Sequence, residues 1–205
     1  MFKNRACGNK YQRLTMHTIE PHYSWRVYYI AENDQNSPFF AREYSEFYFT
    51  HAIYDHYIHP QWDHFGSETL FIKIIYAHYE KRFAIIEMMG EWNDCLFNDI
   101  MYLKRNVIEL MIEQGINKFI LIGENLLNFH SLEDSYYQEW AEEIEDGWIV
   151  AMNFREHVKQ EFLNEQLDAF IFFGGLLDTF YNWRNFTPLR LYTIIKEEIS
   201  HRLPL

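Results

Sequence analysis

Short apolar runs alternate with segments of helical spacing along most of the chain after residue 69. The runs 70–76 and 83–89 are rich in β-branched and aromatic residues and flank a charged segment at 80–82, so they predict a β-hairpin. Three later apolar runs predict further buried strands, and they cover residues 118–123, 148–152 and 169–173.

Helices are predicted between and after these strands. Apolar residues recur at helical spacing from Leu96 to Met111, with Asn93 or Asp94 as the N-cap and Gly115 after the end. Further helices are predicted at 133–146, 155–164 and 188–201. Continuous apolar strands that alternate with helices are typical of a parallel sheet covered on both faces. We therefore expect a three-layer α/β fold with a mixed, mostly parallel sheet of about five to seven strands.

The first third of the chain predicts an N-terminal α+β extension. Residues 25–31 and 44–50 are predicted strands, and 51–59 is a predicted short helix that ends before Pro60. No change of composition separates this part from the rest. We expect one domain over 16–205, in which an extension of residues 16–68 packs on a core of residues 69–205.

Several local features of the core are shared with a known family. Gly90 precedes a long helix that ends at Gly115 and leads into the strand 118–123, and the helical segment 158–168 leads to the last strand. With the order of elements over 69–173, these features resemble the STAS domain of anti-sigma antagonists and sulfate transporters. The resemblance implies that fold. The family's phosphorylatable Ser or Thr is missing from the turn 123–130, so the resemblance does not extend to phospho-switching, and a flavodoxin-like strand order fits the same pattern.

Polar residues follow the predicted strands where ligands bind in parallel sheets. The loop after the last strand adds Asp178 and Trp183. Two carboxylates and two guanidiniums there suit a polar ligand, or a general acid/base pair with an anion clamp. The alternative is local pairing that only holds the loops in place. The candidate crevice residues are Glu91, Glu124, Asn125, Asn153, Arg155 and Arg184.

Other patterns of catalysis or cofactor binding are weak. Five of the ten histidines fall between His51 and His78, but their spacing matches no metal-binding motif, and we expect no metal. Neither GxGxxG nor GxxxxGK[ST] occurs, so no cofactor is predicted. Cys95 is the candidate thiol, but its neighbours in the sequence include no general base. The catalytic residues, if any exist, are therefore unassigned.

Composition and charge exclude several classes of protein. The chain has 205 residues, 19% aromatic residues and few glycines and prolines (8 and 5), which excludes a disordered protein. A net charge of −12 argues against nucleic-acid binding. Two cysteines outside any CxxC pair favour the cytoplasm, and no run of 18 apolar residues predicts a membrane span.

The charge is unevenly distributed. Residues 1–15 carry four basic side chains and no acid, so the remainder, with 14 Lys and Arg and 30 Asp and Glu, carries −16. We interpret residues 1–15 as a basic docking arm, or as an upstream start with Met16 the true initiator. Seven acids between Ser131 and Asp146, interleaved with aromatics, suggest a docking surface for a basic partner. Its candidate residues are Glu139, Trp140, Glu142 and Glu143. The alternative is an ordinary solvated helix face.

These observations favour a non-enzymatic interaction or regulatory protein, with a protein partner or a second copy of the chain. The alternative is a small-molecule binder or enzyme that uses the crevice. Exposed aromatic side chains within residues 20–65 would favour the homodimer.

Overall fold

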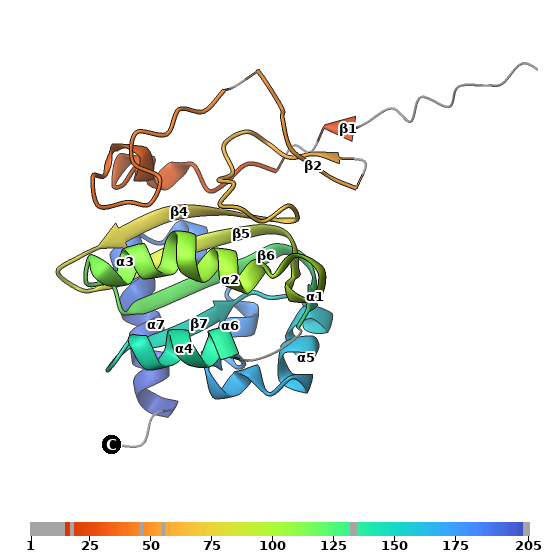
Figure 1. Ribbon diagram of the computed structural model, residues 1–205. Helices are drawn as coiled ribbons and strands as arrows, with labels where there is room; N and C mark the ends of the chain where they lie inside the picture. The colour runs from red at the N-terminus through yellow and green to blue at the C-terminus, as the bar shows by residue number, and fades with distance from the viewer. Residues whose placement is uncertain (1–14, 17–18, 46, 55, 132–134, 203–205) are drawn as a thin grey trace, which may run out of the picture.

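A five-stranded sheet forms the centre of the computed structural model, which describes residues 15–16, 19–45, 47–54, 56–131 and 135–202 (Figure 1). The first strand runs antiparallel to the second and the others are parallel. The strands lie side by side in chain order, whereas a flavodoxin-like sheet places its second strand outside its first. They are β4 (Leu70–His78), β5 (Phe83–Asn93), β6 (Lys118–His130), β7 (Trp148–Met152) and β8 (Ile171–Phe172).

The crossover helices all cover one face of this sheet (Figure 1). Phe119 and Leu121 point to this face and belong to the same buried cluster as Trp140 and Phe162 of the helices. The elements of this layer are α1 (Asp94–Phe97), α2 (Asp99–Leu103), the π-helical turn η3 (Lys104–Ile108), α3 (Glu109–Glu113), α4 (Ser135–Glu143), α5 (Glu156–Asn164) and the 3₁₀ turn η4 (Leu167–Ala169).

The alternate residues of the strands, such as Ile120 and Val150, face the other side and pack on the C-terminal part of the chain. Leu191 and Ile195 of the last helix are fully buried there, together with Trp25 from the N-terminal extension. This layer contains α6 (Leu176–Thr179), η5 (Trp183–Asn185), α7 (Pro188–Arg202) and η1 (Ser24–Val27). Helices on both faces of a mixed, mostly parallel sheet confirm the predicted three-layer α/β class.

The helix predicted after residue 93 is interrupted. Asn93 caps α1 as expected, since its side chain accepts the Leu96 amide, but Asn98 has φ +53° and separates α1 from α2. The Asp94 carboxylate turns inward at this break and accepts Ile100 N–H (2.8 Å) and Tyr137 O–H (2.6 Å). Burial raises the pKa of Asp94 to about 7.

β5 and β6 are longer than the sequence predicts, because Gly90 and Gly123 do not end them. A Cβ atom on Gly90 would lie 2.2 Å from the Thr69 carbonyl oxygen, and one on Gly123 would lie 2.2 Å from the Phe154 ring. The glycines therefore mark close approaches of neighbouring groups rather than chain reversals. As a result, three of the predicted crevice residues lie within strands and not in loops, namely Glu91, Glu124 and Asn125.

The extension differs most from its prediction. The predicted strand 25–31 was wrong, because the chain forms η1 and the 3₁₀ turn η2 (Ala31–Asn33), which place the Trp25 ring 5.3 Å from that of Trp183. The predicted helix 51–59 was also wrong. This segment contains β2 (Ala52–Ile53) and β3 (His56–Tyr57), which form a small sheet with β1 (Thr15–Met16). No strand occurs in the described residues of 44–50.

The extension packs beside β4, the edge strand of the main sheet (Figure 1). Asp63 and Ile72 exchange two backbone hydrogen bonds of 2.7 and 3.1 Å, and the Trp62 indole donates to the Ile19 carbonyl. The predicted basic arm lies outside the described residues, except for Thr15. Within the part of the chain that is described, no helix is long and apolar enough to cross a membrane.

Substitution of two helix-terminal glycines separates close packing from backbone strain. A Cβ at Gly147 would lie 1.8 Å from the Asn117 carbonyl oxygen, whereas one at Gly115 (φ +89°) meets nothing within 4 Å. In urea unfolding we expect Gly147→Ala to cost about 3 kcal/mol or more, and Gly115→Ala about 1 kcal/mol. Equal losses would contradict the close approach at Gly147.

Candidate functional site

An open cavity of about 500 Å³ lies beyond the end of β7. β7 stops at Met152, opposite Ile122, while β6 continues for eight more residues. The space that β7 leaves is bordered by the turn after it and by the chain that follows α6. The lining residues are Glu124, Asn153, Phe154, Arg155, Glu156, Asp178, Thr179, Tyr181 and Arg184.

Glu124 of β6 is held by three donors. One carboxylate oxygen accepts the Asn153 amide (2.9 Å) and the Trp183 indole N–H (2.8 Å), and the other lies 2.7 Å from Arg184 Nη1. Charge-assisted bonds of this kind are strong when the partners are fixed. Glu124 therefore acts as an anchor for the C-terminal segment, and its lone pairs are largely engaged.

Arg184 joins Glu124 to a second carboxylate, that of Glu87. The Nη2 atom of Arg184 lies 3.3 Å from Glu87, which is 2% exposed and also accepts the backbone N–H of His22 at 2.5 Å. Burial raises the pKa of Glu87 to about 7, and the bonds from His22 and Arg184 oppose part of this rise. Burial and the nearby Arg184 lower the pKa of His22 to about 4.

Asn153, the first residue after β7, has a left-handed backbone (φ +56°). Its amide group donates to Glu124 and to the Phe180 carbonyl oxygen (3.0 Å), and its backbone N–H binds the Leu177 carbonyl oxygen (2.7 Å). The side chain is buried, and its Oδ1 atom has no hydrogen-bond partner among the described residues. A strained backbone and an unsatisfied amide oxygen are features that collect at functional sites.

Four of the six predicted crevice residues meet at this cavity, and two do not. Glu124, Asn153, Arg155 and Arg184 line it. Asn125 instead lines a separate cavity of about 250 Å³, which Arg155 also borders. Predicted Asp178 lines the main cavity and Trp183 reaches it through its bond to Glu124.

Glu91 is the sixth predicted residue and lies four positions beyond Glu87 on β5. It accepts the Tyr54 hydroxyl (2.6 Å) and lies 3.3 Å from His130 Nε2. The two carboxylates that share an arginine are therefore Glu87 and Glu124. Glu87 was missed because it lies inside an apolar strand, yet a charged residue in such a run is itself a signal of a buried partner.

The acidic helix α4 finds its basic partners within the chain. The fully buried Lys104 ammonium lies 2.7 to 3.2 Å from carboxylate oxygens of Glu109, Glu139 and Glu143, and Arg105 adds a contact to Glu139. Trp140 is fully buried, so it does not contribute to an outer surface. Glu142 accepts a bond from Gln138 of the same helix. Glu139 and Glu143 therefore hold Lys104, while Glu142 and Glu143 remain exposed and their docking role stays a prediction.

Glu109, Glu139 and Glu143 also lie close enough together to be considered as metal ligands, the one such group found among the described residues. The Lys104 ammonium already supplies a cation between them. In the histidine-rich segment, the rings of His51 and His64 stack at 4.7 Å and 8°, and His59 lies 3.5 Å from Glu20. Three of these histidines thus have partners within the chain.

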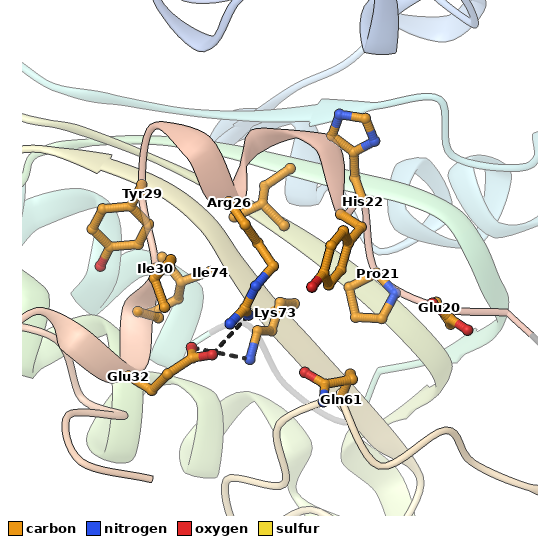
Figure 2. Close-up of a pocket in the computed structure, with 13 residues that line it drawn as sticks. Glu20, Pro21, His22, Arg26, Tyr29, Ile30, Glu32, Gln61, Lys73 and Ile74 are labelled. Carbon is orange, nitrogen blue, oxygen red and sulfur yellow. Dashed lines mark hydrogen bonds and ion pairs between the residues drawn. The ribbon is translucent and has the colours of Figure 1, made fainter. Parts of the chain in front are cut away.

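A second buried ion-pair cluster ties the extension to β4 (Figure 2). Arg26 and Lys73 both point at Glu32, with N–O distances of 2.7 and 3.6 Å, and Lys73 also lies 3.4 Å from the buried Asp63. Burial opposes the charge of Glu32, but Lys73 and Arg26 outweigh it and lower its pKa. The adjoining space is only about 20 Å³, so this cluster has a structural role.

Removal of Lys104 tests the interpretation of α4. Lys104→Met removes the buried cation that contacts all three carboxylates, and we expect a loss of about 3 kcal/mol in urea unfolding. Arg105→Gln on the same turn removes an exposed charge and should cost much less than the loss of Lys104, because solvent screens exposed ion pairs. Similar costs for both would contradict the central place of Lys104.

Burial of the Glu87 and His22 side chains predicts opposite pH effects. The pKa of Glu87 is raised from 4.5 to about 7, so its contribution to stability is lost as pH rises through that range. The pKa of His22 is lowered from 6.5 to about 4, so its contribution is lost as pH falls through that range. We compare the slope of the unfolding free energy against pH between pH 4.5 and 6.5. Relative to the wild type, this slope should be more positive in Glu87→Gln and more negative in His22→Asn.

The measurement is urea unfolding at several pH values. Unchanged slopes in both variants would contradict the assigned protonation states.

The sequence was compared with models of known protein families and with curated proteins. No family model matches the chain, and no curated protein resembles it closely enough to count as a match. The resemblance to the STAS domain stays a prediction from the order of elements. The functional interpretation therefore depends on the geometry of the molecule itself.

Proposed function

We propose that the protein is a non-enzymatic interaction module that associates with a second copy of itself through its N-terminal extension. The observation that carries this proposal is the exposure of large apolar side chains. Of the 13 such residues exposed in the described part of the chain, eight belong to residues 19–54. The most exposed of these eight are Phe47 (84%), Val27 (81%), Tyr48 (76%), Tyr54 (66%) and Tyr23 (65%).

These side chains project from an anchored segment. Trp25, Phe39 and Trp62 of the same extension are buried, and the Trp25 indole donates to the Phe186 carbonyl oxygen at 3.1 Å. An ordered surface loses little conformational entropy on binding, so aromatic side chains on it are effective contacts. Exposed apolar patches on an ordered surface are typical of interaction sites.

Part of the charge of the extension is compensated within the chain. Arg26 is paired with Glu32 at 2.7 Å, and Asp34 is engaged by the hydroxyl groups of Tyr29 and Tyr79. Residues 16–68 still hold eight acids and two bases, so the apolar contact between two copies has to outweigh their mutual repulsion. A symmetric pair presents the same patch twice, which needs no second protein.

The polar cavity supports a non-enzymatic role. Its best candidate for acid/base work, Glu124, is held by three donors, and Glu91 lies elsewhere with its own partners. A general base needs a free lone pair within reach of a substrate proton. The low cysteine content supports a cytoplasmic setting.

Sedimentation equilibrium of the full chain tests the proposal. We expect a concentration-dependent dimer for the wild type. The double variant Phe47→Ser and Tyr48→Ser should weaken association about tenfold or more, because the exposed aromatic rings lose their buried area in the pair. Leu96→Ser, at an equally exposed position (77%) on α1, is the matched control and should associate like the wild type.

A monomer at every concentration would overturn the proposal. Equal association of the double variant and the wild type would also overturn it, because the contact would then lie on another surface.

A further inference from the structure

We propose that the cavity beyond β7 binds a small molecule through a carboxylate or phosphate group, held by Arg155 and the N-terminus of α5. This inference is independent of self-association, because the residues involved lie in the core and not in the extension. The cavity, about 500 Å³, is large enough for a metabolite-sized ligand.

Each carboxylate around the cavity is paired with Arg184 or Lys159, and one further cation has no carboxylate partner within the described residues. The carboxylate of Glu124 is paired with Arg184, and those of Glu156 and Asp178 are paired with Lys159 at 2.7 and 2.8 Å. Arg184 is itself engaged by two carboxylates. The wall therefore offers no free acid to repel an anion at close range.

Arg155 is the exception. Its Nε atom lies 3.4 Å from the Glu124 backbone oxygen, and it forms no ion pair with any residue in the described part of the chain. Arg155 is exposed, so its guanidinium can be reached from the cavity that it lines. A planar guanidinium binds carboxylate or phosphate oxygens in a bidentate manner.

Arg155 is also the N-cap residue of α5, a helix of nine residues. No side chain caps this end, so the first-turn N–H groups lack a side-chain acceptor. The Glu156 carboxylate is 71% exposed and engaged by Lys159. An uncapped helix N-terminus attracts anions through its N–H groups and dipole. The helix end and the guanidinium therefore favour the same ligand charge.

The remaining side chains that line the cavity indicate which groups the ligand carries besides its acid. The Asn153 amide lies in this wall, and its buried Oδ1 atom has no partner among the described residues. Tyr181 lines the cavity and is 67% exposed, which leaves a ring face for a planar group. The structure thus favours a small aromatic acid over a bare ion.

Amide chemical shifts of the ¹⁵N-labelled full chain test this site, with inorganic phosphate, phenyl phosphate and benzoate as probes at constant ionic strength. We expect saturable shifts of the amides of Glu156, His157 and Val158. Whichever of phenyl phosphate and benzoate binds more tightly shows whether the site prefers a phosphate or a carboxylate. We expect both to bind more tightly than inorganic phosphate, because their aromatic rings add contacts.

Three variants locate the contacts. Arg155→Gln should weaken binding about tenfold, the loss expected when one charge-assisted contact is removed. Arg190→Gln, an exposed arginine on α7, is the matched control and should bind like the wild type. Tyr181→Ala should weaken the aromatic probes and leave inorganic phosphate unchanged. Absence of saturable shifts with all three probes, or equal binding by Arg155→Gln and the wild type, would overturn the proposal.

Discussion

The long parallel pairing of β5 with β6 is the constraint on which the rest of the structure depends. The two strands stay paired from Phe83 beside Lys118 to Asn93 beside His130, whereas β7 ends opposite Ile122. Half of β6 therefore has no strand neighbour on its outer side. Carbonyl groups on such an edge need other partners. Arg155 approaches the Glu124 carbonyl oxygen at 3.4 Å, and the His157 ring lies 2.7 Å from that of Leu127. The cavity follows from this difference in strand length.

Buried charges fix the segments that surround the sheet. Lys104 joins α4 to the helix before it, Lys73 joins the extension to β4, and Arg184 joins the C-terminal segment to β5 and β6. The desolvation of such groups is costly, and only well-placed partners offset that cost. Each cation is accordingly in contact with more than one carboxylate. We infer that these clusters select one arrangement of the layers, while the apolar faces of the sheet supply most of the stability.

The two surfaces with proposed roles meet at one carboxylate. Glu87 accepts the backbone N–H of His22, which belongs to the extension, and contacts Arg184, which lines the cavity. The extension and the cavity wall are therefore linked by direct contacts through a single buried group. The surfaces differ in character, because one exposes aromatic rings and the other exposes an unpaired guanidinium. Each suits a different kind of partner.

The sequence by itself determined the α/β class, the hairpin, β7, α5 and the start of α7 at Pro188, because these segments carry strong local periodicity or a fixed backbone preference. It also placed Glu124, Asn153, Arg155 and Arg184 near one another, since parallel strands end at a common edge. Only the tertiary structure decided the lengths of β5 and β6, where close contacts at Gly90 and Gly123 outweigh the usual role of glycine as a breaker. It also decided the turns of the extension, where burial of Trp25 outweighs local strand preference. Ion pairing across sequence-distant segments has no local signal, so the choice of Glu87 over Glu91 was left to the folded chain.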